Sequence, residues 1–277
     1  MALVVSTNIA SINAQRSMNG AQRAMDLSYA QLASGSRITK AAGDAAGLSI
    51  SETLKSTIRG YQQAQRNAND GMSMVQVAEG GLGEISNILT RLRELAVQSA
   101  SDTVGNDERE FINKEVIQLK DEVQRIAEST RFGSRNLLDG SGAEYEFQID
   151  VHNDDFKDRI AFDASLQQAT LSSLSIEDLS FDIKESAQDS LEVIDEAQKQ
   201  VNGYRANLGA IQNRLISTSE NLGVAIENFS AANSRIRDTD VAKSSAEVTR
   251  NNILLNASVG VLTQANQSPA AALKLLS

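Results

Sequence analysis

His152 is the only histidine in the chain, so any catalytic triad would have to use it as the base. Asp150 or Asp154 would then orient its ring, but no serine stands out as the nucleophile. Asp154 and Asp155 form a carboxylate pair, yet such pairs recur in any acidic chain, and nothing converges on this one to hold a substrate. A polar residue on a solvated turn is the simpler interpretation of His152, and we expect no catalytic residue.

Motifs for metals and cofactors are incomplete in this sequence. The turn Asn153-Asp-Asp155 lacks the spaced ligand series, ending in a bidentate Glu, that calcium needs. A His-Glu-x-x-His zinc motif needs two histidines, and the chain has no cysteine to supply thiolates. Gly80-Gly-Leu-Gly83 is glycine-rich, but no Lys-Ser or Lys-Thr follows it and no strand precedes it. We therefore expect no metal, no cofactor and no enzymatic activity.

The bulk composition limits the partners. The formal net charge is −10, and no basic stripe is present to neutralise phosphates, so we expect no nucleic acid partner. No stretch reaches the roughly 18 to 20 consecutive apolar residues that span a bilayer, and we expect no membrane insertion. The first residues lack a basic segment followed by an apolar core, so we expect no cleaved signal peptide.

Long helices must carry whatever the chain does, because its only proline is Pro269. Apolar residues recur seven apart from Leu54 to Ala96, which predicts one coiled-coil-like helix from about Ala45 to Ser99, with its weakest point at Gly80–Gly83. A second long helix is predicted by the same period from Ile194 to Ile236. A shorter helix should start at a cap formed by Asn106 or Asp107 and end near Thr130.

Between the long helices, alternation from Tyr145 to Val151 and the segment Arg159–Phe162 predict a β-hairpin at about 143–163. The helices should pack side by side, because none can shield its own apolar face. We expect the bundle core to contain Leu54, Leu82, Leu89, Leu92, Ile112, Leu119, Ile126, Leu208, Leu215, Leu222 and Phe229.

The two ends have weaker seams, built largely from Ala, Ser, Met and Asn. Helices with so little to bury are marginal alone, so the ends should be mobile in a single copy and become ordered when many copies assemble. Small residues let backbones approach closely, which favours a polymer. The residues expected to form these self-assembly seams are Met18, Met25, Leu32, Val241, Val248, Leu255 and Leu262.

Several specific strings resemble bacterial flagellin, in family order and over nearly the whole chain. Near the start these are Thr7-Asn-Ile-Ala-Ser-Ile-Asn-Ala-Gln-Arg16 and Leu32-Ala-Ser-Gly-Ser-Arg-Ile38. Near the end they are Ser234-Arg-Ile-Arg-Asp-Thr-Asp240 and Leu262-Thr-Gln-Ala-Asn-Gln267. Only about 50 residues separate the bundle helices, so the chain is similar to a short flagellin that has the two inner domains and no large outer domains.

The resemblance implies a mainly α fold: an elongated bundle with a small β-hairpin (41–240), plus a terminal two-helix coiled coil formed by 1–40 with 241–277. It implies a structural subunit of the extracellular flagellar filament, a helical homopolymer used for motility. The implied partners are other copies of the chain, the flagellar export apparatus, an export chaperone holding the segment from Val241, and the filament cap. An animal innate immune receptor is implied at Arg91, Leu95 and Glu115.

Three other interpretations stay open at this stage. A minor filament or hook-junction protein of the same export class would share most of these features. A cytoplasmic coiled-coil adaptor would explain the heptads and would form an oligomer of fixed size. A hydrolase would depend on His152, and activity that survives His152→Ala would exclude it.

Overall fold

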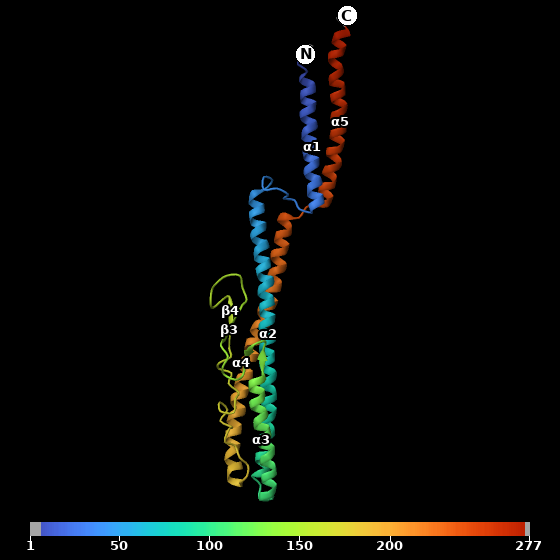
Figure 1. Cartoon of the computed structure of the whole chain (residues 1–277). Helices are drawn as coiled ribbons and strands as arrows, with labels where there is room; N and C mark the ends of the chain where they lie inside the picture. The colour runs from blue at the N-terminus through green and yellow to red at the C-terminus, as the bar shows by residue number, and fades with distance from the viewer. Residues whose placement is uncertain (1–6, 275–277) are drawn as a thin grey trace. The chain divides into compact units, whose positions relative to one another are not determined.

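Five helices and two small antiparallel sheets make up the part of the chain that the computed structural model describes, residues 7–274, with side chains described to 267. The order is α1 (Ile9–Ser34), α2 (Ala45–Ser99), α3 (Asn106–Ser129), β1 (Arg131–Phe132), β2 (Arg135–Asn136), β3 (Glu144–Gln148), β4 (Arg159–Asp163), α4 (Lys184–Arg237) and α5 (Val241–Lys274) (Figure 1). The predicted mainly α class with one small β-hairpin is confirmed.

The structure divides into two compact units. One contains the residues up to 56 together with those from 228 onward, and the other contains 57–227. Both α2 and α4 run through the two units, so the division falls inside these helices rather than at their ends. We call them the terminal unit and the central unit.

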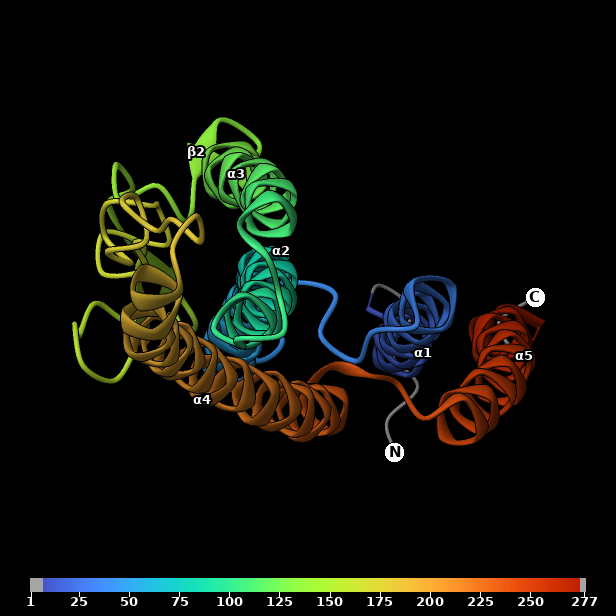
Figure 2. The ribbon, with the colours of Figure 1, turned by 90° about the horizontal axis from the view of Figure 1, so that it is seen from below.

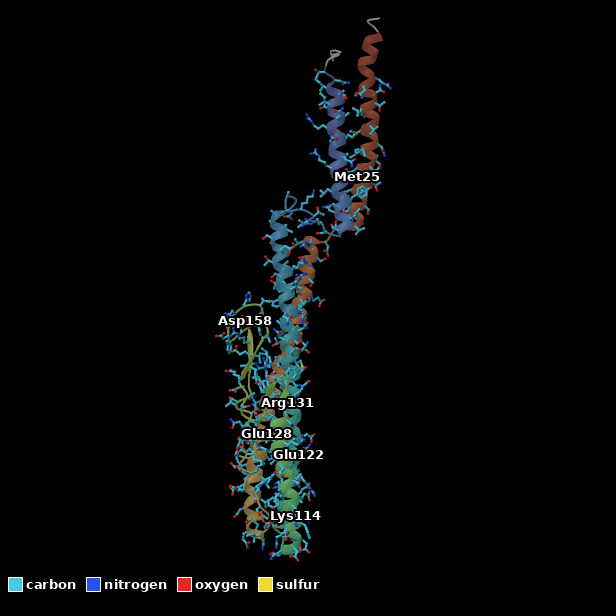
Figure 3. The ribbon with its side chains drawn as sticks, viewed as in Figure 1. Met25, Lys114, Glu122, Glu128, Arg131 and Asp158 are labelled. Atoms are coloured by element: carbon cyan, nitrogen blue, oxygen red, sulfur yellow. The ribbon has the colours of Figure 1, made fainter. Side chains whose placement is uncertain are left out.

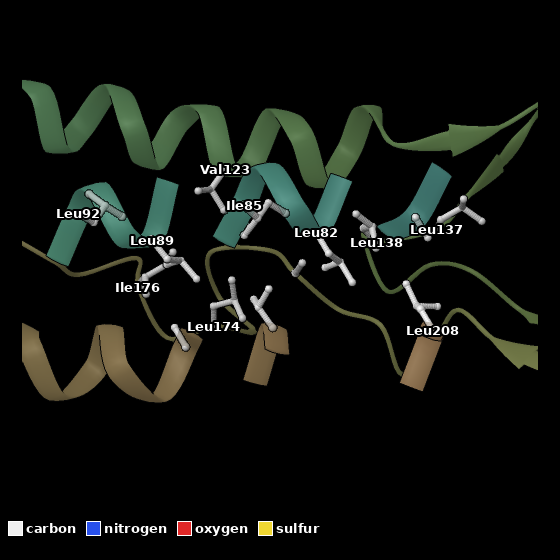
Figure 4. Packing of buried hydrophobic residues seen from close by; sticks show 14 of the residues in the cluster. Leu82, Ile85, Leu89, Leu92, Val123, Leu137, Leu138, Leu174, Ile176 and Leu208 are labelled. Atoms are coloured by element: carbon white, nitrogen blue, oxygen red, sulfur yellow. The ribbon is translucent and has the colours of Figure 1, made fainter. Parts of the chain in front are cut away.

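In the central unit, α2, α3 and α4 lie side by side (Figures 1 and 2). Leu82, Leu89 and Leu92 of α2 are fully buried, and Val123 of α3 and Leu208 of α4 pack into the same core (Figure 4). Burying each such side chain contributes roughly 1.5 to 3 kcal/mol, so this core dominates the stability of the unit.

Most of the residues expected in the bundle core lie in this core. Ile112, Leu215 and Leu222 are also buried, while Leu119 and Ile126 are half-buried and pack against the cluster. Leu54 and Phe229 are half-buried and belong to the terminal unit.

One prediction about a helix end was wrong. The N-cap of α3 is Gly105, which makes no side-chain cap hydrogen bond, and Asn106 is the first helical residue. The Asn106 side chain is used elsewhere, since its Oδ1 accepts a hydrogen bond from Arg109 Nη1 at 3.0 Å. The α2 helix continues unbroken through Gly80–Gly83. At Gly81 a Cβ would lie 2.7 Å from Thr130 Oγ1 and 2.8 Å from Leu138 Cδ1, so this glycine allows close packing rather than a bend.

Glycines also seat the hairpin on α2. β3 and β4 pair antiparallel, with Phe147 opposite Ile160. A Cβ on Gly71 would lie 2.9 Å from the Phe147 ring, and one on Gly60 would lie 2.2 Å from Val151 Cγ1. Gly60 and Gly71 are about three helical turns apart and therefore lie on one face of α2. The absence of a side chain at these two positions lets the hairpin approach the helix.

Replacing Gly71 by alanine is expected to lower the free energy of unfolding of the central unit by about 1–3 kcal/mol, because the added methyl overpacks against Phe147. The matched control is Gly209→Ala on α4, where no atom lies within 4 Å of the new Cβ. That change should stabilise by about 0.5–1 kcal/mol, because glycine weakens a helix interior. Chemical denaturation measures the free energy of unfolding of both variants. A change in the same direction for the two variants would contradict close packing of Phe147 against Gly71.

Candidate assembly surface

The terminal unit pairs α1 with α5 in antiparallel order, as Figure 1 shows. At one end the Asn8 side chain donates from Nδ2 to the Ala265 carbonyl at 2.8 Å, while its Oδ1 accepts from Ser11 N and caps α1. At the other end Thr239 N donates to the Gly35 carbonyl at 3.0 Å. These bonds set the register of the pair and bring Met18 to the level of Leu255 and Met25 to the level of Val248.

The predicted seam residues lie mostly along this pair, and the structure shows how they are used within one copy. Ala14, Ala21 and Ser28 of α1, seven residues apart, are buried. The larger Met18, Met25, Leu32, Val248, Leu255 and Leu262 are half-buried, and Val241 is 63% exposed. The small residues therefore form the close contact in one chain, and the larger ones keep part of their apolar surface exposed. Met25 is labelled on α1 in Figure 3.

A second set of apolar side chains in the terminal unit was missing from the predicted seams. Its members are about half exposed or more in the described part of a single chain, and they are Ile9, Ile12, Leu27, Ile253, Leu254, Val259 and Val261. Large apolar residues off the heptad positions of both end segments were the signal that could have identified this set. Large apolar side chains left exposed on two paired helices are candidates for contact with a partner.

The loop that follows α1 is tied to the end of α4. Gly35 adopts the left-handed conformation, with φ of 67°, and ends α1. Arg37 N then donates to the Arg237 carbonyl at 2.7 Å, and the Arg37 guanidinium donates to the Ile236 carbonyl at 2.8 Å. Arg237 in turn pairs with Glu52 of α2. Two of the strings singled out in the sequence, Leu32–Ile38 and Ser234–Asp240, therefore meet in one joint.

In the central unit, the three residues of the suggested receptor site differ in accessibility. Arg91 and Glu115 are about half exposed and form an ion pair at 2.8 Å across α2 and α3. The hydrogen bond that Arg91 donates to Glu115, with a second that it donates to Glu94, raises the pKa of Arg91. Leu95 is only 2% exposed, so its side chain cannot contact a partner directly.

The residues considered for chemistry are not assembled into a site. His152 is exposed, and its backbone carbonyl accepts a hydrogen bond from Gln148 Nε2 at 2.8 Å. Asp154 Oδ1 accepts backbone hydrogen bonds from Lys157 and Phe156, which lower the pKa of Asp154. Within residues 7–274, no three His, Asp or Glu side chains are grouped to hold a metal ion. None of the helices described is long and apolar enough to cross a membrane.

Comparisons with known proteins point to one family for both end segments of the chain and for its whole length. Residues 5–143 match the family described as the bacterial flagellin N-terminal helical region, and residues 191–276 match the bacterial flagellin C-terminal helical region. A flagellin of Halalkalibacterium halodurans is 42% identical, covering 99% of this chain and 100% of its own. The flagellar filament 33 kDa core protein of Treponema phagedenis is 38% identical, with the same coverage.

Among solved structures, the crystal structure of Bacillus cereus flagellin is similar, with a TM-score of 0.51 and 33% identity over 57% of this chain and 88% of that one. Long helices, a buried leucine-rich core and a pair of end helices are typical of a structural helical protein. The chain belongs to the bacterial flagellin family. Flagellins are structural filament proteins and not enzymes, so the hydrolase and adaptor interpretations are set aside.

Proposed function

We propose that the chain assembles into the flagellar filament through the terminal unit. As a flagellin it is a structural subunit of that filament, and it functions in the extracellular flagellum. The proposal rests on the large apolar side chains of α1 and α5 that one copy leaves uncovered, such as Leu27, Ile253 and Leu254. Burying them between copies would supply the free energy that orders the ends.

A hollow of about 290 Å³ between α1 and α5 supports contacts between unlike surfaces. It is lined by small residues of α1, including Ala10, Ala14 and Ser17, and by Leu254 and Val261 of α5. A protruding apolar side chain from a neighbour would fill it. Contacts that join unlike surfaces do not close on themselves and generate helical polymers. In this proposal residues 1–40 with 241–277 form the inner part of the filament, and 41–240 surround them.

The family also implies partners before assembly. These are the flagellar export apparatus, the filament cap and an export chaperone that holds the segment from Val241. The chaperone would cover the exposed apolar residues of α5 until polymerisation. Receptor contact at the central unit would use Arg91 and Glu115, with Leu95 supporting them from the core.

Seeded growth followed by electron microscopy tests the assembly proposal. Purified intact chain should extend filament seeds into tubes of uniform diameter. Chain trimmed to 41–240 should fail to extend them, because it lacks α1 and α5. Continuous tubes from the trimmed chain, indistinguishable from those of the intact chain, would refute the role given to the terminal unit.

A further inference from the structure

The contact between α1 and α5 repeats every seven residues, so it does not by itself select one alignment of the two helices. The buried positions of α1 hold the small residues Ala14, Ala21 and Ser28, and the half-buried positions between them hold Met18, Met25 and Leu32. The same alternation occurs on α5, with Ser244, Asn251, Ser258 and Ala265 buried or half-buried and with Val248, Leu255 and Leu262 between them. A slide of α1 by seven residues would therefore place small residues opposite small ones and large residues opposite large ones.

A polar contact is what usually selects the register of such a uniform seam. Asn251 is the polar seam residue that could do this from within, but its side chain makes no hydrogen bond to any of the described residues. The choice of register is therefore left to the polar contacts at the two ends of the pair.

The lengths of the two linkers make α1 the helix that is free to slide. Only three residues, 238–240, join α4 to α5, whereas ten residues, 35–44, join α1 to α2. A slide of seven residues moves a helix by about 10 Å. Ten residues reach up to about 35 Å when extended. The longer linker can therefore follow the movement unless a contact holds it.

Arg37 holds this linker at the end of α4, where the two linkers pass each other (Figure 1). Its guanidinium donates from Nε and Nη2 to the Ile236 carbonyl, at 3.0 and 2.8 Å, and its backbone N donates to the Arg237 carbonyl at 2.7 Å. These are the last carbonyls of α4, where the helix dipole favours a positive charge. Nη2 also lies 3.5 Å from the carboxylate of Asp44, which caps α2 by accepting from Gly47 N.

We propose that Arg37 is a positioning residue that selects one register of the α1–α5 pair. Gly35 ends α1 only two residues before Arg37, so the guanidinium fixes the end of α1 at the end of α4. In this register Met25, labelled in Figure 3, lies at the level of Val248, and one heptad away it would lie at the level of Leu255.

The register matters for assembly because it decides which exposed apolar side chains of α1 and α5 lie next to each other. A polymer repeats one contact from copy to copy, so all copies must present the same arrangement. The inference rests on the proposed filament function and names the residue that prepares the terminal unit for it.

Competing disulfides measure the register, because the chain has no cysteine of its own. The full chain is given Met25→Cys, Val248→Cys and Leu255→Cys and is equilibrated in a glutathione buffer. A disulfide needs Cα atoms within about 7 Å, so position 25 can link only to the position opposite it. Peptide mapping should find the 25–248 link at least about tenfold over the 25–255 link, a preference of the size that hydrogen bonds from a charged group provide.

Adding Arg37→Ala to this chain should bring the two links to similar amounts. The matched control is Arg23→Ala on α1, whose Nε donates only to the Asn19 carbonyl of the same helix, at 3.2 Å. This control should keep the preference of the parent chain. An unchanged preference in Arg37→Ala would overturn the proposal, whether or not that chain forms filaments.

Seeded growth separates positioning from a general loss of stability. Arg37→Ala with Met25→Cys and Val248→Cys should need at least about twice the subunit concentration when reduced, because only part of the population holds the right register. Oxidation should restore growth to that of the oxidised chain that keeps Arg37, because the disulfide fixes the register. Growth of the oxidised variant below that of this control would refute the role of Arg37. Failure of the intact wild-type chain to grow would instead refute the proposed function, while the ratio of the two disulfides would still report the register.

Discussion

Replacing Leu255 by arginine is expected to abolish seeded filament growth. Leu255 is half-buried at the level of Met18 in the α1–α5 pair. An arginine there would bring a charge into an apolar seam with no carboxylate placed to receive it, and such burial costs several kcal/mol. The central unit should melt as in the wild type, because its core lies within 57–227. Electron microscopy of seeded samples and thermal melting by circular dichroism measure the two effects.

Ile253→Arg is the informative comparison for Leu255→Arg. Ile253 is 63% exposed and lies outside the set that closes the pair within one copy. Both variants should therefore block growth and leave the helical content of the central unit unchanged, but only Leu255→Arg should also weaken the α1–α5 pair. Growth of Leu255→Arg at the wild-type rate would show that the seam has no part in assembly.

The helices could be predicted from the sequence because their apolar residues repeat at a fixed spacing. The predicted bounds of α2, Ala45–Ser99, agree with the structure, and α3 ends within a residue of Thr130. α4 starts earlier than its heptads indicated, at Lys184, where Ala187 and Ser190 fill the buried positions. Small residues at these positions give no periodic signal of their own.

Irregular segments could not be predicted in this way. Leu174, Ile176, Leu179 and Phe181 are buried although they belong to no helix or strand. Leu174 and Ile176 cover the α2–α4 side of the core in Figure 4. Leu174 and Ile176 are two residues apart, as are Leu179 and Phe181, but the step of three between the pairs breaks the alternation that would mark a strand. Only the packed structure shows that this loop completes the core.

The candidate assembly surface was predicted in part. Heptads identified the residues that line the α1–α5 pair, but they could not show that small residues make the contact within one copy while larger ones keep their exposure.

Arg109 is the other residue that the sequence did not single out, because arginines are usually exposed. It is 6% exposed and holds the turn between α2 and α3. Nε donates to the Ser99 carbonyl at 2.9 Å, Nη2 to the Ser101 carbonyl at 3.0 Å, and Nη1 to Asn106. Ser99 is itself buried and donates from Oγ to the Phe181 carbonyl at 2.8 Å. One guanidinium thus satisfies the carbonyl of Ser99, the last residue of α2, where the helix dipole favours a positive charge, and that of Ser101 in the turn.

Arg109→Met should lower the free energy of unfolding of the central unit by about 2–4 kcal/mol, because it leaves two backbone carbonyls and the Asn106 side chain without their donor. Arg109→Lys should recover little of this loss, since an ammonium group cannot reach three acceptors in the fixed fork of a guanidinium. The matched control on the same helix is Arg125→Met, which removes an exposed ion pair with Glu122 and should cost less than about 1 kcal/mol. Chemical denaturation of the three variants measures these differences. Equal losses for Arg109→Met and Arg125→Met would mean that the α2–α3 turn is held by the surrounding apolar packing and not by this guanidinium.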